Sequence, residues 1–385
     1  MEAPITDGIE SSEAYFTPAV EDSLSEFGDD VEAVIERSKS HWTQVDTAGA
    51  WTDSEEDLQA ENGKFFQGLK ENTRKRFFKD YGESLKVGRK IGEGGQAEIF
   101  EGTWTRNERA TEVVVKMFKQ GYKLADLQRL WPKGMFHSDF ASDFVCGILG
   151  ATLLDGRLAF VMSRCWGDLR RVLDLRMRKR KHGPPFEFQE ARKIMSNIAH
   201  GMAALHAHGI LHRDLKASNV LLSLNAWTND RLDKDYDVCS DEREIRDELY
   251  LIADFESSEN VQGTGFWRAP EVLRTIQKNG SASLENIWTE KVDAYSYGIT
   301  CYEILTGRMP FDHIKGLKSA DFGIVLEGGR PPLPDYIPTW IQEVVQKCWH
   351  PEPSKRPTFN EIIGLLHSTQ DFEEKWKVTR RFGWF

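Results

Sequence analysis

The chain has 385 residues, of which 40% are hydrophobic and 29% are charged. This apolar content is enough for a sizeable core and excludes a wholly disordered chain, and the length admits one two-lobed domain or two domains. The formal net charge of −11 gives no support to nucleic-acid binding, which usually requires a basic footprint.

The negative charge is concentrated at the N-terminal end. Residues 1–62 contain 17 Asp and Glu but only two basic residues, Arg37 and Lys39, which makes a local charge of −15. By difference from −11, the remaining residues carry +4. Such an acidic segment with few aliphatic residues is predicted to be disordered. An interaction tail or an autoinhibitory arm is the functional alternative.

Cysteine usage and hydropathy indicate the compartment. The five cysteines include no CxxC pair, which predicts neither a disulfide framework nor a zinc site and favours a reducing compartment. The most apolar stretch, 148–162, is interrupted by Asp155 and Arg157, and the first residues resemble neither a signal peptide nor a myristoylation site. We expect a cytoplasmic protein. The basic run at 176–181 leaves a nuclear location open.

The composition changes after residue 62. Residues 63–83 are basic and aromatic and are expected to form an ordered lead-in. Alternating or β-branched segments at 85–91, 98–100 and 111–117 predict three short strands of an antiparallel sheet. Beyond about residue 184, four apolar residues recur at helical spacing: Ile194, Ile198, Met202 and Leu205. Strands followed by helices predict an α+β fold.

A glycine cluster separates the first two predicted strands. It reads Ile91-Gly-Glu-Gly-Gly-Gln-Ala-Glu-Ile99, and glycine lets backbone N–H groups approach phosphates closely. A dinucleotide-binding loop would open a helix, so its position between strands favours a flap over phosphates. By itself, a simple glycine-rich hairpin turn is the ordinary alternative.

Further along the chain, polar residues adjoin short apolar segments. Lys116 ends the run Val113-Val-Val and would be costly to bury without an anionic partner such as a phosphate; a lysine at a strand edge is the ordinary alternative. The segment His212-Arg-Asp-Leu-Lys-Ala-Ser-Asn219 lets one loop present a base, a cation and a metal ligand together. Asp254 follows an apolar strand, and Gly263-Thr-Gly-Phe-Trp-Arg-Ala-Pro-Glu271 comes shortly afterwards.

These motifs, in this order, resemble the eukaryotic protein kinase family over roughly residues 84–370. Asp293-Ala-Tyr-Ser-Tyr-Gly298 and Cys348-Trp-His-Pro-Glu-Pro-Ser-Lys-Arg356 extend the match and resemble the tyrosine-kinase-like group, which includes mixed-lineage and Raf-like Ser/Thr kinases. The resemblance implies a bilobal fold with a β-rich N-lobe at 84–162, a helical C-lobe at 163–370 and a C-terminal tail at 371–385.

The resemblance also implies a role for each matching residue. Asp214 would orient the substrate hydroxyl and accept its proton, Lys216 would steady the transferred phosphoryl group, and Asn219 and Asp254 would hold Mg²⁺. The implied ATP site comprises Ile91, Gly92, Glu93, Gly94, Gly95, Ala97, Ile99, Lys116, Met162, Ser163, Arg164, Cys165, Asn219 and Asp254. Within it, Lys116 would contact the α- and β-phosphates, and residues 163–165 would face adenine. Met162 would be the gatekeeper, with a plain core role as its alternative.

The activation segment and two structural pairs complete the comparison. Ser257, Ser258 and Thr264 are the hydroxyls available for an activating phosphate between Asp254 and Glu271, although Thr264 is better explained as a substrate-positioning residue. Lys216 and Thr264 favour Ser/Thr over Tyr substrates. Asp293 and a Glu271–Arg356 pair are expected to be structural.

The chain departs from the family pattern in four places, of which the mildest is Ala97 at the position of the third flap glycine. No Glu lies between Glu112 and Glu187 to pair with Lys116; Asp126, Gln128 or Asp139 could substitute. Asp-Phe-Gly is replaced by Asp254-Phe-Glu256, which puts a carboxylate beside the phosphate site. An insert at 224–248 is a solvated extension or a docking surface.

Two functions remain open on this basis. The first is a Mg-ATP-dependent Ser/Thr protein kinase, slowed by the departures, acting on a protein substrate. The second is a pseudokinase that binds nucleotides or partners and signals by conformation. A metabolic small-molecule kinase is disfavoured by the Thr264 segment and Ala269-Pro-Glu271. The acidic N-terminal region and the insert are candidate surfaces for partners.

Overall fold

A computed structural model describes residues 81–94, 97–119, 142–155, 157–180, 183–224, 248–255, 263–277, 287–318 and 321–367. The predictions for residues 1–62, for nearly all of the 63–83 lead-in, for the interior of the 224–248 insert and for the 371–385 tail fall outside these residues. The domain boundaries drawn from the sequence therefore stay predictions.

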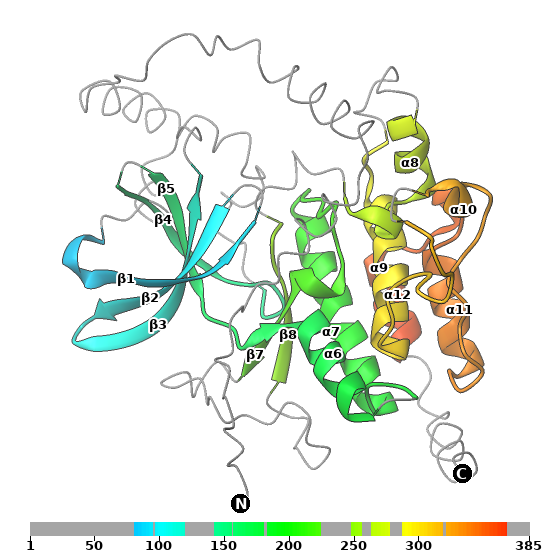
Figure 1. The fold of residues 1–385 in the computed structure, drawn as a ribbon, viewed down its shortest axis with the longest axis horizontal. Coiled ribbons are helices and arrows are strands. Elements are labelled where there is room, and N and C mark those ends of the chain that lie inside the picture. The colour runs from blue at the N-terminus through cyan, green and yellow to red at the C-terminus, as the bar shows by residue number, and fades with distance from the viewer. Residues whose placement is uncertain are drawn as a thin grey trace, which may run out of the picture.

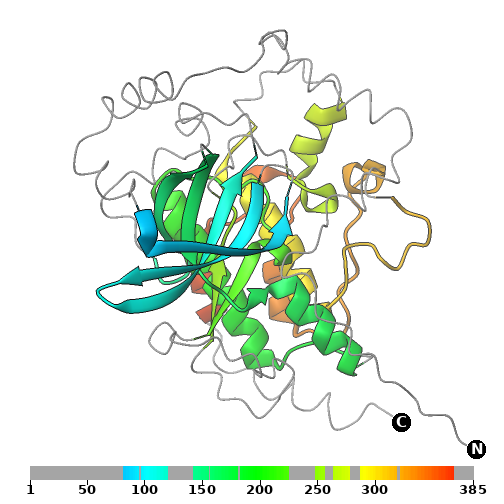
Figure 2. The same cartoon turned by 60° about the vertical axis from the view of Figure 1, so that its left-hand side comes forward.

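A five-stranded antiparallel sheet opens the described chain (Figure 1). A short 3₁₀ turn, η1 (Gly82–Ser84), leads into β1 (Leu85–Glu93), β2 (Ala97–Arg106), β3 (Arg109–Phe118), β4 (Ile148–Leu154) and β5 (Arg157–Ser163), in the spatial order β1-β2-β3-β5-β4. Val113 and Val115 on β3 alternate with Val114 and are fully buried against Val161 of β5. The three strands expected from the sequence are confirmed. Figure 2 shows them as part of one twisted sheet.

Between this sheet and the helices lies a small three-stranded sheet. It consists of β6 (Gly167–Asp168), β7 (Val220–Leu224) and β8 (Glu248–Ile252), and the 3₁₀ turn η4 (Ala217–Asn219) precedes β7. The backbone N–H of Cys146 donates to the carbonyl of Ile252 at 2.8 Å, and the N–H of Ile252 donates to the carbonyl of Phe144 at 2.9 Å. These bonds tie the small sheet to the segment that enters β4.

The second half of the chain is mainly helical. Its elements are α6 (Leu169–Arg180), α7 (Phe188–Ala207), η6 (Gly265–Trp267), α8 (Pro270–Gln277), α9 (Glu290–Thr306), α10 (Gly323–Leu326), α11 (Thr339–Cys348), η8 (Pro353–Lys355) and α12 (Phe359–His367). The α7 residues expected to form a buried face, Ile194, Ile198, Met202 and Leu205, are all fully buried. The α+β, bilobal fold is confirmed.

One glycine lets α7 pack closely against the small sheet. A Cβ on Gly201 would lie 2.5 Å from the Phe144 carbonyl oxygen and 2.7 Å from Cγ1 of Ile252, which is closer than real Cβ contacts. Ile252 is the last residue of β8. Its contact with Gly201 therefore helps to position the segment that follows, which carries Ala253 and Asp254. Helix α9 is buried on nearly every side and forms the centre of the helical region. Within the described residues, no helix is both long and apolar enough to cross a membrane.

Candidate active site

The sheet and the helical region meet through Lys116 and Asp254. Lys116 lies on β3 opposite Ile99 of β2 and Phe160 of β5, so its stem is enclosed and only 10% of its side chain is exposed. Its ammonium donates to Oδ1 of Asp254 at 2.6 Å. The anionic partner that burial of Lys116 demands is therefore found in the protein itself.

Asp254 has a left-handed backbone conformation and a carboxyl group whose pKa is lowered. It is a non-glycine residue at φ +61°, a left-handed conformation that costs about 1 kcal/mol or more. Desolvation by the surrounding protein raises the pKa of its carboxyl, but the charge and hydrogen bond of Lys116, with smaller effects from His212 and Lys216, outweigh this and hold the pKa below its usual value. Half of the side chain remains exposed, at 51%, so the carboxylate is charged and accessible.

Asp293 holds the loop that carries Asp214 through hydrogen bonds to its backbone. The buried carboxylate of Asp293 accepts the backbone N–H groups of His212 and Arg213, both at 2.8 Å, and lies 2.8 Å from Nε2 of His206. Burial raises the pKa of Asp293, but His206 and the other donors outweigh it, so the pKa is lowered. Arg213 sits at φ +66°, and these two backbone bonds stabilise that strained turn. The structural role expected for Asp293 is confirmed.

The residues expected to carry catalysis lie together in this loop. Lys216 Nζ is 3.0 Å from Oδ2 of Asp214 and donates to Oγ1 of Thr264 at 2.7 Å. Asn219 Nδ2 donates to the backbone carbonyl of Asp214 at 2.8 Å. The other carboxylate oxygen of Asp214, Oδ1, is buried and has no hydrogen-bond partner among the described residues. Asp214, Lys216, Asn219 and Thr264 thus form one connected group.

A chain of backbone contacts joins this group to Asp254. The N–H of Ala253 donates to the carbonyl of Asn219 at 3.0 Å, and the His212 ring contacts the Ala253 carbonyl at 3.0 Å. The lysine, the loop base and the candidate metal ligands are therefore positioned relative to one another by β3, η4 and β8.

The glycine segment lies where β1 ends and β2 begins, and these two strands pair antiparallel. Gly92 pairs with Ile99, and the N–H of Gly94 donates to the Ala97 carbonyl at 2.8 Å. Glu93 pairs with Lys90 and, at 2.7 Å, with Lys119. The hydrogen bond from Lys119, followed by that from Lys90, lowers the pKa of Glu93 to about 2. Ile91 and Ala97 lie on the same hairpin, whereas Gly95 lies outside the described residues.

The residues expected to form the hinge end β5 and follow it: Met162 and Ser163 belong to the strand, and Arg164 and Cys165 come directly after it. Met162 is buried in the main core, which fits both the gatekeeper role and the plain core role, so its assignment stays a prediction. Ser163 donates its backbone N–H to the Gly147 carbonyl at 3.0 Å. The Arg164 guanidinium lies against the sheet, 3.3 Å from Glu101 and 3.7 Å from Glu112. Cys165 packs at the edge of the core. Arg164 is thus held to both β2 and β3.

Sequence reasoning missed Glu303, a buried carboxylate in the middle of α9. It accepts hydrogen bonds from the backbone N–H of Ala217 at 3.1 Å and from Nε1 of Trp267 at 2.8 Å, and it pairs with Arg170 at 3.2 Å. It therefore links the catalytic loop to the 263–271 segment. Its one sequence signal is an acidic residue inside an otherwise apolar helical stretch, a signal that does not identify its partners.

The expected Glu271–Arg356 pair is confirmed. Two parallel bonds join them, Nη1 to Oε1 at 2.7 Å and Nη2 to Oε2 at 2.9 Å, and Arg356 is fully buried. Asp126, Gln128, Asp139, Glu256, Ser257 and Ser258 lie outside the described residues, so their assigned roles stay predictions.

Comparison with known proteins agrees with this geometry. The sequence profile of the protein tyrosine and serine/threonine kinase family matches residues 85–366. The chain is 28% identical over 298 residues to serine/threonine-protein kinase STY17 of Arabidopsis thaliana, covering 74% of this chain and 44% of the relative. It is 30% identical over 203 residues to serine/threonine/tyrosine-protein kinase HT1 of Arabidopsis thaliana, covering 50% of this chain and 44% of the relative.

A third relative is a light-sensor protein kinase of Ceratodon purpureus, 28% identical over 309 residues, with 75% of this chain and 22% of the relative covered. The chain thus spans less than half the length of these three curated relatives. The profile match covers most of the chain, including β1, the Lys116 strand, the Asp214 loop and α12. The chain therefore belongs to the protein tyrosine and serine/threonine kinase family.

Proposed function

We propose that the chain is a serine/threonine protein kinase that transfers the γ-phosphoryl group of Mg-ATP to hydroxyls of protein substrates. The observation that carries the proposal is the state of Asp214. Its Oδ1 is buried without a hydrogen-bond partner among the described residues, and leaving such an acceptor unsatisfied is costly. A substrate hydroxyl that donates to Oδ1, once substrate binding has opened access to this enclosed oxygen, would satisfy it and would be oriented for proton transfer.

Lys216 is placed to stabilise the negative charge of the transferred phosphoryl group. It is held between Asp214 at 3.0 Å and Thr264 at 2.7 Å, so its charge is fixed beside the base before any substrate arrives. Preorganised charge of this kind stabilises a transition state without reorganisation during the reaction. Thr264 contributes the second acceptor and connects Lys216 to the 263–271 segment, against which a protein substrate would bind.

The donor atoms of Asp254 and Asn219 suit Mg²⁺. Mg²⁺ prefers oxygen ligands and is commonly held by one or two carboxylates together with substrate phosphates. Asp254 offers a charged, half-exposed carboxylate, and Asn219 uses its Nδ2 on Asp214, which leaves its amide oxygen for a cation. When bound, the ion would neutralise charge on the phosphates. Lys116, now 2.6 Å from Asp254, would then turn part of its hydrogen bonding to the phosphates.

The test compares the wild-type chain with Asp214→Asn, using Mg-ATP and a mixture of Ser-, Thr- and Tyr-containing peptides. We expect slow transfer to Ser and Thr by the wild type, none by Asp214→Asn, and equal nucleotide binding by both. Binding of Mg-ATP without transfer above the Asp214→Asn background would contradict the kinase proposal and support a pseudokinase. Phosphotyrosine as the main product would contradict the substrate class.

A cytoplasmic location, with the nucleus left open, is part of the proposal and rests on the cysteine pattern and the basic run at 176–181. Imaging of the tagged chain with and without neutralisation of that run tests it. Exclusion from both compartments would contradict it.

A further inference from the structure

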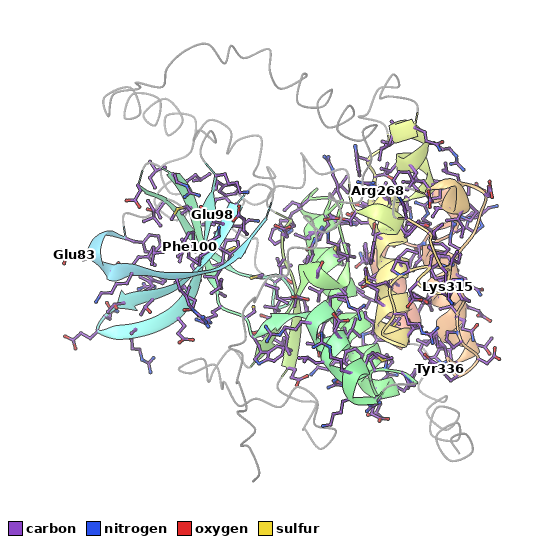
Figure 3. All side chains as sticks on the ribbon, in the orientation of Figure 1. Glu83, Glu98, Phe100, Arg268, Lys315 and Tyr336 are labelled. Carbon is purple, nitrogen blue, oxygen red and sulfur yellow. The ribbon has the colours of Figure 1, made fainter. Side chains whose placement is uncertain are left out.

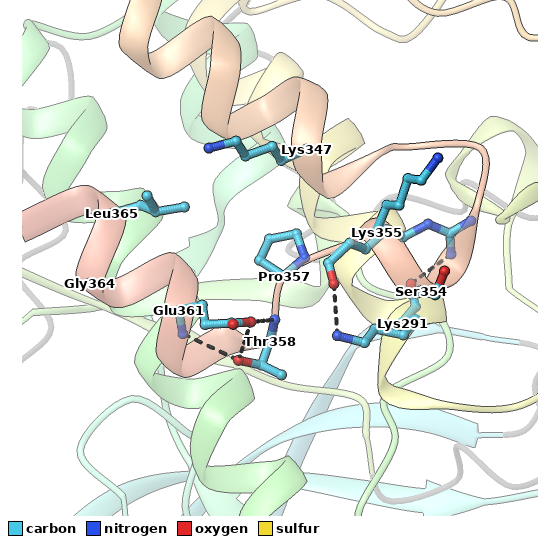
Figure 4. A pocket seen from close by; sticks show the side chains of 10 residues that line it. Lys291, Lys347, Ser354, Lys355, Pro357, Thr358, Glu361, Gly364 and Leu365 are labelled. Atoms are coloured by element: carbon cyan, nitrogen blue, oxygen red, sulfur yellow. Dashed lines mark hydrogen bonds between the residues drawn. The ribbon is translucent and has the colours of Figure 1, made fainter.

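A surface hollow lies on the helical region, and its lining contains no residue of the Asp214 loop. It measures about 730 Å³ and lies where α11, η8 and α12 meet the first turn of α9 (Figure 4). Four cationic side chains line it, Lys291, Lys347, Lys355 and Arg356, against one carboxylate, Glu361. This excess of positive charge plays no part in the catalysis described above.

Two of the lysines are available to an anion. Lys347 is exposed and has neither an ion pair nor a side-chain hydrogen bond among the described residues, and Figure 4 shows it extending from α11 over Pro357 toward the side of Leu365. Lys291 donates to the Arg356 carbonyl at 2.7 Å, which uses one of its three N–H donors. Arg356 is committed to Glu271, and Lys355 pairs with Glu352 at 2.8 Å.

The carboxylate in the hollow is already used. Glu361 accepts the backbone N–H of Thr358 at 2.7 Å and its hydroxyl at 2.8 Å, an arrangement that caps the start of α12. Leu365 and Pro357 add apolar surface beside the lysines. The hollow therefore suits an acidic peptide with an occasional apolar side chain.

The chain itself contains such a peptide. Residues 1–62 carry −15, and their densest cluster is Asp53-Ser-Glu-Glu-Asp57, followed by Leu58. We propose that this acidic N-terminal segment binds in the hollow of the same molecule, with the carboxylates of 53–57 on Lys347 and Lys291. Opposite charges at this density attract strongly at low ionic strength and are screened by salt.

The connecting chain is long enough for this contact. Residues 58–80 join the acidic cluster to Tyr81, the first described residue, and 23 extended residues span at most roughly 75 Å. A folded domain of this size has a radius of gyration of about 19 Å and is about 50 Å across. The direct distance across the domain is therefore shorter than the extended tether, so the length of residues 58–80 does not exclude the contact.

Zero-length carbodiimide cross-linking of the full chain, followed by mass spectrometry, tests the contact directly. We expect cross-links from Lys347 and Lys291 to the carboxylates of 53–57 at low salt, and their loss at high salt. Lys315 is an exposed lysine outside the hollow (Figure 3) and serves as the internal control. Equal labelling of Lys315 and Lys347 would overturn the proposal. Cross-links that disappear on dilution would overturn it too, because they would join two copies.

A competition experiment provides a second readout that does not depend on cross-linking. The probe is a fluorescent peptide of residues 50–62. A full chain neutralised by Asp53→Asn, Glu55→Gln, Glu56→Gln and Asp57→Asn should bind it on the order of tenfold more tightly than the wild type, whose own tethered segment competes at millimolar effective concentration. Adding Lys347→Glu to the neutralised chain should abolish this gain, whereas adding Lys315→Glu should not. Equal binding by wild type and neutralised chain would overturn the proposal.

Discussion

The ammonium of Lys116 and the carboxylate of Asp254 lie 2.6 Å apart, although 138 positions separate them in the chain. One belongs to a strand of the N-terminal sheet and the other follows the last strand of the small sheet. The pair therefore spans the line along which the two lobes meet. A bound metal ion would compete with Lys116 for the carboxylate of Asp254. Binding of a metal-nucleotide complex would therefore weaken a contact that holds the two lobes together.

Replacing Lys116 by Met should slow phosphoryl transfer and raise the pKa of Asp254. We expect kcat/KM for phosphoryl transfer to fall roughly 10²-fold or more, since a preorganised charge at the phosphates is lost. The pKa of Asp254 should rise, because desolvation then acts on its carboxyl without the opposing lysine. Peptide phosphorylation assays measure the first effect, and Mg-ATP titrations repeated across a series of pH values measure the second, through the pH at which binding is lost. Unchanged transfer by Lys116→Met would rule out a phosphate-contacting role for this residue.

Thr264 should act through Lys216. Thr264→Val keeps the shape of the side chain but removes the acceptor that lies 2.7 Å from the ammonium. Hydrogen bonds to charged groups contribute about 1.5–3 kcal/mol, so kcat should fall roughly tenfold or more. Thr264→Ser, the matched control, should retain most of the rate. If Thr264→Ser loses as much as Thr264→Val, the hydroxyl does not position Lys216.

Arg356 should contribute to stability and not to chemistry. Arg356→Met leaves Glu271 without its bidentate partner, and breaking a buried pair from one side costs about 3–5 kcal/mol. Urea unfolding measures the loss. The double variant Glu271→Gln/Arg356→Met should lose less than the sum of the two single changes. Strict additivity would show that the pair makes no joint contribution.

Glu248 predicts a pH dependence of stability. Burial raises the pKa of this carboxyl to about 7 from 4.5, helped by the charge of Glu190 and opposed by Arg176 and Lys193. Between pH 4.5 and 7, the folded protein holds a proton on Glu248 that the unfolded chain has lost. The free energy of unfolding therefore falls as the pH rises from 4.5 to 7, and the destabilisation reaches its full size above pH 7. It amounts to roughly 3 kcal/mol at pH 8.

Thermal unfolding at pH 5 and pH 8 measures this effect. Glu248→Gln should raise Tm at pH 8 while changing it little at pH 5, and it should flatten the pH dependence. Glu343→Gln, an exposed glutamate on α11, is the matched control and should follow the wild type at both values. A larger stabilisation by Glu248→Gln at pH 5 than at pH 8 would contradict the assigned sign.

Local patterns explain why so much of the site could be predicted. Asp214, Lys216 and Asn219 fall within six positions of one loop, so their proximity follows from chain connectivity. The buried face of α7 follows from a 3.6-residue period, and the strands of the first sheet follow from β-branched runs and a glycine turn. The Glu271–Arg356 pair was expected from family resemblance and not from spacing.

Only the folded chain decided which distant groups meet. The amino-acid sequence by itself determined the α+β class, the order of the motifs and the charge of each segment, because these depend on local composition and periodicity. It did not indicate that Glu303 would join Ala217 and Trp267, or that the guanidinium of Arg164 would lie against Glu101. Such contacts depend on how helices and sheets pack, since burying a charge requires a partner that packing brings from elsewhere in the chain.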